Sequence, residues 1–173
     1  MLQISIPAQE YFDERTEEFI NVKSYTIQLE HSLISISKWE AKWCKPFLGK
    51  EEKTEEETID YIRCMTITQN VDPLAYNAIP VKELEKVKAY INAPMTATWF
   101  RDRENRAPSR KVITSELIYY WMVANSIPFE CEKWHFNRLM TLIRICGEKN
   151  QPPKKMSKSD RKSLMAQRRA ARK

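Results

Sequence analysis

A cysteine and a histidine lie four positions apart in the segment IPFECEKWHFNRLMTLIRIC, which spans residues 127–146. If this segment is one helix, Cys131 and His135 share a face, and Cys146 lies further along the chain. A thiolate and an imidazole so placed could ligate zinc, or act as a nucleophile with its base. This pair is therefore the first candidate for chemistry.

The rest of the sequence supports neither reaction. A structural zinc site needs four ligands, whereas the chain has two histidines and four cysteines, with no CxxC pair. A nucleophilic thiolate needs a partly exposed, electropositive surrounding, and here Trp134 and Phe136 flank the pair. We therefore predict that Cys131 and His135 serve in packing, and we expect no metal site.

Other motifs for catalysis or cofactor binding are missing from the sequence. The chain has only two glycines, Gly49 and Gly147, which is too few for a Walker loop or a Gly-rich dinucleotide fingerprint. The acidic run EEKTEEE, residues 51–57, has no following glycine to fold it into a cation-binding loop, so we predict a solvated helix start. Neither GxSxG nor HExxH occurs. We expect a protein that is not an enzyme and binds no cofactor.

The cysteines and the hydropathy indicate a reducing, aqueous compartment. Cys44, Cys64, Cys131 and Cys146 each lie among apolar residues of a predicted helix, which is typical of buried, reduced cysteines. No run of 18 apolar residues occurs, and the acidic start of the chain has no basic and apolar leader pattern. The expectation is a soluble protein of the cytoplasm.

Hydrophobic periodicity predicts the elements that would position these residues. Alternation at Leu2, Ile4 and Ile6 indicates a half-buried strand, and Thr54 and Glu57 have the spacing of a helix capping box. The predicted helices cover residues 32–45, 54–67, 80–92, 114–125 and 130–147, and the predicted strands cover residues 2–6, 18–30, 96–100 and 110–113. The predicted fold class is α+β, a mostly helical single domain with a few short antiparallel strands.

The last two predicted strands enclose the charged segment RDRENRAPSRK, residues 101–111. We predict that this segment is the exposed tip of a hairpin. Its two acids partly neutralise its basic residues, so solvent exposure explains it better than a binding role does.

The formal net charge of +6 is unevenly distributed along the chain. Residues 149–173 contain ten Lys or Arg and one acid, a net of +9, which leaves −3 for residues 1–148. We predict a compact body over residues 1–148 and a basic linker with a mobile helical tail over residues 149–173. The residues expected to bind an acidic partner are Lys154, Lys155, Lys158, Arg161, Lys162, Arg168, Arg169 and Arg172. A tail that only aids solubility is the alternative.

Several segments of the chain resemble a known group of proteins. These are LEHSLISISKWEAKW, TEEETIDYIRCMTIT, ITSELIYYWMVANSIPFECEKWHFNRLMTLIR and PPKKMSK. They are similar to the tail assembly chaperones and other small tail-module proteins of bacteriophages with long, non-contractile tails. The resemblance extends over most of the chain, and it rests on the overall run of residues rather than on a functional signature.

The resemblance implies a non-enzymatic protein made in the cytoplasm of the infected host. A tail assembly chaperone would bind the long, helical tape measure protein and protect its apolar stretches during tail morphogenesis. Self-association is a further option, and no membrane partner is expected. Two other classes stay open: a DNA-associated packaging or head–tail connector protein that binds nucleic acid non-specifically through its basic tail, and a structural subunit of the virion.

Overall fold

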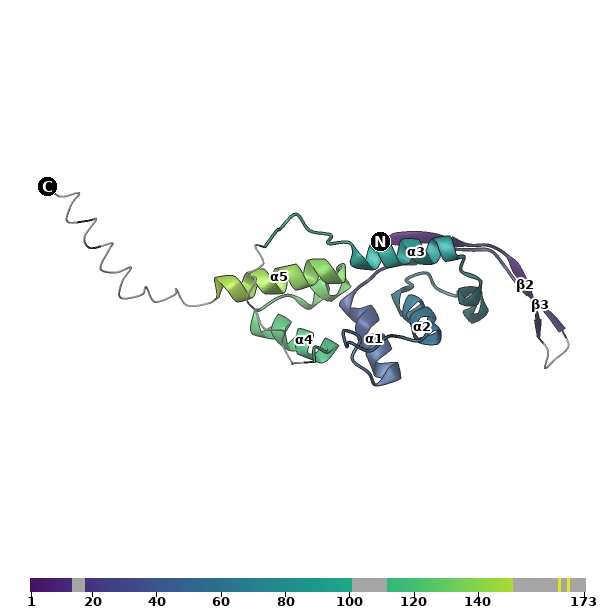
Figure 1. Cartoon of the computed structure of the whole chain (residues 1–173), viewed down its shortest axis with the longest axis horizontal. Helices are drawn as coiled ribbons and strands as arrows, with labels where there is room; N and C mark the ends of the chain where they lie inside the picture. Colours follow the sequence, from purple (N-terminus) through teal and green to yellow (C-terminus); the bar gives the residue numbers. More distant parts are fainter. Residues whose placement is uncertain (14–17, 101–111, 151–164, 166–167, 169–173) are drawn as a thin grey trace.

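The computed structural model describes residues 1–13, 18–100, 112–150, 165 and 168 (Figure 1). They form the predicted α+β fold, with helices and two small antiparallel sheets. The strands are β1 (Leu2–Ile6), β2 (Gln9–Asp13), β3 (Glu18–Val22) and β4 (Tyr25–Leu29). The α-helices are α1 (Leu33–Trp43), α2 (Glu55–Met65), α3 (Val81–Asn92), α4 (Ser115–Ala124) and α5 (Phe136–Lys149), and the 3-10 helices are η1 (Pro73–Ala78) and η2 (Phe129–Lys133). No helix in these ranges has the length and apolar character that crossing a bilayer requires.

The four strands form one long hairpin in two sections. Strand β1 pairs with β4, so that Ile4 lies opposite Ile27, and β2 pairs with β3. The β1–β4 section belongs to the body, whereas the β2–β3 section, here called the arm, projects from one end of it (Figure 1). The predicted strand 18–30 is two strands in the structure, and the prediction missed β2 altogether.

The predicted alternation in β1 and β4 places one set of side chains in the core. Ile4, Ile6, Ile27 and Leu29 are buried, while the residues between them are exposed. The outer edge of β4 is covered by the chain after α2, because Ile67 donates its backbone N–H to Gln28 O at 2.8 Å. The first hairpin section is thus integrated into the body on its face and along this edge.

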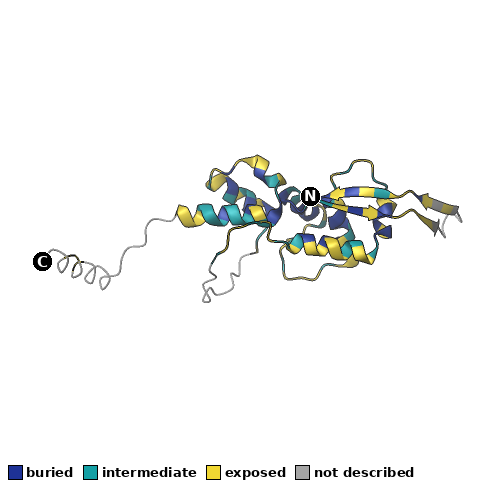
Figure 2. Cartoon of the chain, turned by 90° about the horizontal axis from the view of Figure 1, so that it is seen from above, coloured by how far each residue is buried: buried dark blue, intermediate teal, exposed yellow. Residues whose placement is uncertain are grey.

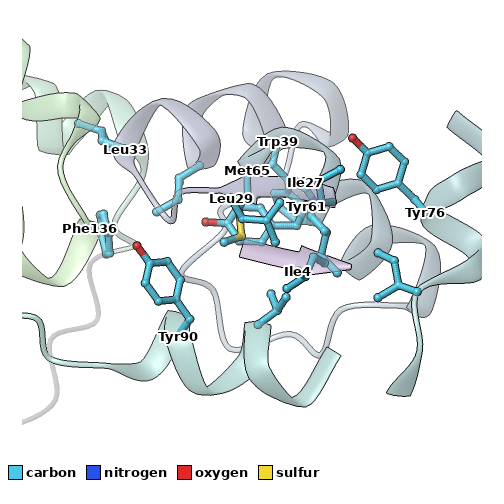
Figure 3. Packing of buried hydrophobic residues seen from close by; sticks show 14 of the residues in the cluster. Ile4, Ile27, Leu29, Leu33, Trp39, Tyr61, Met65, Tyr76, Tyr90 and Phe136 are labelled. Carbon is cyan, nitrogen blue, oxygen red and sulfur yellow. The ribbon is translucent and has the colours of Figure 1, made fainter. Parts of the chain in front are cut away.

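The core joins these strands to the helices (Figure 3). Leu33 and Ile36 of α1 are completely buried, and Trp39 is 1% exposed. The indole N–H of Trp39 donates to the carbonyl of Glu57 at 2.9 Å, which fixes α1 against α2. Truncation of a core residue such as Leu33 to Ala is expected to cost about 2–5 kcal/mol.

The capping box at the start of α2 is confirmed. Glu57 N–H donates to Thr54 Oγ1 at 3.2 Å, and Thr54 N–H donates to Glu57 Oε2 at 2.9 Å. Two N–H groups that the helix itself leaves unpaired are therefore satisfied.

The start of the last predicted helix, 130–147, is wrong. Phe129–Lys133 forms the separate 3-10 helix η2, and His135 is the N-cap of α5 with φ −54° and ψ 130°. Phe136 donates its backbone N–H to the carbonyl of His31 at 2.7 Å. The Phe136 N–H thus bonds to a distant part of the chain, whereas in a continuous helix it would bond to a carbonyl of the same helix.

The predicted hairpin of residues 96–100 and 110–113 is wrong as far as the structure describes it. Residues 96–100, 112 and 113 contain no strand. Thr98 donates its N–H to the hydroxyl of Thr96 at 3.1 Å, a local bond that competes with a strand ladder. The charged segment 101–111 lies outside the described residues.

Candidate functional site

Cys131 and His135 are both buried, but they do not share a helix face as predicted. Cys131 lies in η2, and His135 caps α5. The His135 ring uses both of its nitrogens: Nδ1 accepts from Asn137 N at 3.3 Å, and Nε2 lies 3.0 Å from Tyr90 O. Burial raises the pKa of the Cys131 thiol, which is opposite to the activation that a nucleophile needs. The surroundings of Cys131 and His135 therefore favour a structural role for both residues.

The two histidines of the chain meet in the interior, which could not be predicted from local sequence patterns. The rings of His31 and His135 are arranged edge to face, with an interplanar angle of 71° and centroids 5.2 Å apart. His31 Nδ1 lies 2.5 Å from Tyr61 Oη, and Tyr90 Oη donates to Glu30 Oε1 at 2.7 Å. We call Glu30, His31, Tyr61, Tyr90 and His135 the polar core cluster; Figure 3 shows its two tyrosines among the core residues.

The charge states in the polar core cluster follow from burial. Burial, with a smaller contribution from His135, lowers the pKa of His31 to about 4, so the ring is neutral at pH 7. Burial likewise lowers the pKa of His135 and raises the pKa of Tyr61. The Tyr61 hydroxyl therefore stays protonated and can donate a hydrogen bond to His31 Nδ1.

Within the described parts of the chain, no group of three or more His, Cys, Asp or Glu side chains could hold a metal ion. The acidic run behaves as predicted at Glu51, Glu52, Glu55 and Glu56, which are exposed. Glu57 is the exception, since it is buried in the capping box and lies 2.7 Å from Lys45 Nζ.

A pocket of about 670 Å³ lies beside the start of α2, lined partly by Lys42, Asp60 and Arg63. Burial raises the pKa of Asp60, but the hydrogen bonds from Lys42 and Trp43 outweigh burial and hold the pKa below its ordinary value. Arg63 Nη1 is also within 3.9 Å of Asp60 Oδ1. Lys42, Asp60 and Arg63 thus satisfy one another, which makes this part of the pocket a poor acid–base or anion site.

Helix α4 has an exposed apolar face. Its inner side is buried, with Ile118 and Met122 at 0% exposure. On its outer side Tyr120 is 65% exposed and Val123 is 60% exposed, beside the exposed Ala124. A helix that is apolar on every side is normally buried on every side, so this exposure needs a reason.

The exposed face of α4 continues onto η2. Phe129 is 56% exposed, and its ring lies 6.4 Å from the ring of Tyr119, centroid to centroid. Tyr119 is anchored by its hydroxyl, which donates to Glu132 Oε2 at 2.8 Å. We call Tyr120, Val123, Ala124 and Phe129 the α4 face. Clustered apolar exposure of this kind marks interaction surfaces more often than scattered single residues do.

The basic residues predicted to bind a partner lie outside the described residues, except Arg168, which is exposed. Two arginines of α5 instead cover aromatic rings, since Arg138 stands 4.3 Å from the ring centroid of Trp134 and Arg144 stands 3.8 Å from that of Phe100. Both arginines therefore make cation–π contacts with aromatic rings of the body.

Comparison of the chain with protein-family models, with curated proteins and with solved structures found no match. The assignment of a function therefore depends on the geometry of this chain. Among the features above, the α4 face is the surface whose exposure the fold itself does not explain.

Proposed function

We propose that the protein is a non-enzymatic assembly factor that binds an amphipathic helix of a partner protein on the α4 face. The observation that carries the proposal is the exposure of Tyr120 and Val123 on a helix that is apolar all round. Their spacing of i and i+3 makes a ridge along α4, and ridges of this kind pack into the grooves of another helix. Helix-in-groove recognition uses the same apolar anchors.

The bacteriophage resemblance gives the proposed partner its chemistry. A tape measure protein is long and largely helical, so its apolar stripes would match the α4 face, and binding would keep those stripes from aggregating. The basic segment 149–173 would add electrostatic attraction to acidic parts of the partner. The proposed role is that of a tail assembly chaperone acting in the host cytoplasm.

Co-expression with the tape measure protein of the same genome tests this proposal. The informative variant is Tyr120→Gln with Val123→Gln, because both side chains are exposed and their replacement should leave stability within about 0.5 kcal/mol. The matched control is Val81→Gln, which alters an exposed valine on α3. We expect the native chain and the control to keep the partner soluble and co-purify with it.

The double variant should co-purify about tenfold less partner, the loss expected when interface anchors worth more than 1 kcal/mol are removed. If the native chain forms no complex, or if the double variant binds as well as the control, the α4 face is not a partner site. Finding the chain as a stoichiometric component of purified particles would favour a structural subunit instead.

The net charge of +9 in residues 149–173 favours a second candidate, a DNA-associated protein. Neutralisation of phosphates makes the logarithm of the binding constant fall with the logarithm of the salt concentration, with a slope of about −0.9 per phosphate. Duplex binding with such a slope, without preference for a phage protein, would support this candidate over the chaperone.

A further inference from the structure

The β2–β3 arm is a hairpin that joins the body only at its base in the described residues, where Val22 of β3 is 2% exposed and belongs to the core. Figure 1 shows it projecting beyond the helices, and Figure 2 shows exposed residues along it. The backbone cover that residues 65–68 give to β4 has no counterpart along β2 or β3 in the described parts of the chain. A two-stranded hairpin alone is marginally stable in water, and its open edges can pair with another chain. The arm therefore has the properties of a contact element.

The arm is strongly acidic. Strands β2 and β3 contain Glu10, Asp13 and Glu18 and no basic residue. Asp13 and Glu18 are directly opposed in the register of the two strands. Like charges in directly opposed positions destabilise a strand pair. A cationic partner would remove this repulsion, whereas a second acidic arm would increase it.

The most basic part of the chain begins at the other end of the body. Helix α5 ends at Lys149, and in Figure 1 this end of α5 and the arm lie at opposite ends of the molecule. The residues that follow α5 supply most of the +9 charge of residues 149–173. The acidic arm and the end of α5, from which the basic segment continues, are thus separated by the length of the body.

We propose that the chain self-associates head to tail, with the basic segment 151–173 of one copy bound to the acidic arm of the next copy. Opposite charges at opposite ends make the contact heterologous, so the same contact can be repeated from copy to copy. Arm-to-arm pairing is opposed by the acidic residues of both arms. This association shares the basic segment with the proposed function but uses neither α4 nor η2, so the Tyr120→Gln, Val123→Gln variant should leave it unchanged.

Sedimentation of the full chain over a range of concentrations tests the proposal. At low salt the average mass should rise above the 20.6 kDa of one chain as concentration increases. At ~1 M salt, where the Debye length is about 3 Å, the mass should return to that of the monomer. A chain that stays monomeric at every concentration in low salt would overturn the proposal. Binding of the basic segment to the arm of its own chain would give this result.

Two neutralised full-length variants separate the two halves of the contact. The arm variant carries Glu10→Gln, Asp13→Asn and Glu18→Gln. The segment variant carries Lys154→Gln, Lys155→Gln, Lys158→Gln, Arg161→Gln and Lys162→Gln. Each variant alone should be monomeric, and their mixture should form a one-to-one dimer that does not grow, because one partner offers only an arm and the other only a segment.

A charge-matched control carries Glu51→Gln, Glu52→Gln and Glu85→Gln, which neutralises three exposed acids outside the arm. This control should associate as the native chain does. Association of the segment variant alone would indicate arm-to-arm pairing, and association of the arm variant alone would place the contact elsewhere; either result contradicts the head-to-tail contact. Equal thermal melting of all variants shows that the body is intact.

Discussion

At the scale of single residues, buried polar groups connect parts of the chain that are far apart in sequence. Glu40 of α1 is 7% exposed, and its two carboxylate oxygens accept from Phe47 N and from Ser115 N, both at 2.7 Å. The second of these N–H groups belongs to the first turn of α4, where a negative charge also interacts favourably with the helix dipole. One side chain thus fixes the loop after α1 and the start of α4.

Replacing Glu40 by Gln should lower the free energy of unfolding by about 1–3 kcal/mol, because the new amide group faces a backbone donor that then lacks an acceptor. Chemical denaturation measures the change. Glu52→Gln, at an exposed position, is the matched control and should change stability by less than about 0.5 kcal/mol. Equal stability of the two variants would show that the Glu40 hydrogen bonds are unimportant.

His31 should make the stability of the protein depend on pH. Its pKa is about 4 in the folded chain against an ordinary 6.5, so between these values the unfolded chain binds a proton that the folded chain does not. Stability is therefore complete above pH 6.5 and falls as the pH is lowered. From pH 6.5 to pH 4.5 the loss attributable to His31 should be about 2 kcal/mol.

His31→Asn provides the comparison, because Asn keeps an acceptor near Tyr61 but does not titrate. Its stability should be lower at pH 7 and should fall less steeply in the same range. His135, whose pKa is also lowered, adds a smaller loss of the same sign. The pKa values of Glu57 and Asp60 are lowered from 4.5 and 3.8, so those groups act at lower pH. A flat native profile from pH 6.5 to pH 4.5 would contradict the role of His31.

At the scale of elements, patterns that depend on near neighbours predicted the structure well. The alternation in β1, the start of α2 and the ends of α3 are correct within two or three residues, because local burial and capping decide them. The break at His135 could not be predicted, since its cause is a hydrogen bond to His31. The exposure of the α4 face could not be predicted either, because apolar composition alone does not show whether a helix is covered.

The cap of α5 can be tested by substitution. His135→Ala should cost about 1 kcal/mol for the lost cap, with an added cost for the unpaired Tyr90 carbonyl, whereas His135→Asn should cost less because Asn is a good N-cap. Denaturant melts give both values. Cys131→Ala should lower stability alone, and protein purified without added metal should contain no stoichiometric zinc. A metal lost on changing His135 would refute this structural role.

At the scale of the whole molecule, the hydrophobic core and most of the net positive charge belong to different parts of the chain. The acidic body contains the core, and the basic residues follow the end of α5. We therefore expect the basic segment to act in binding without a role in folding. The count of charges along the chain predicts this separation without any structure.

Ending the chain after Asn150 should leave the melting temperature nearly unchanged. Leu164 and Met165 are the only large apolar side chains after Ser157, Met165 is 53% exposed, and each would contribute at most ~1.5–3 kcal/mol if buried. The shortened chain should bind an acidic partner more weakly, and the native interaction should weaken with rising salt. Loss of cooperative unfolding on truncation would mean that the segment belongs to the core.

The hydrogen bond from Phe136 to His31 also sets an order of events during synthesis. The two residues are separated by 105 positions, and α1 packs on one side against α2 and on another against α4 and η2. At about 5–20 residues per second, His31 and α1 leave the ribosome roughly 5–20 s before their last partners are made. Throughout that interval one apolar side of α1 lacks its partners, so we expect the growing chain to expose a site that chaperones of the cell can bind.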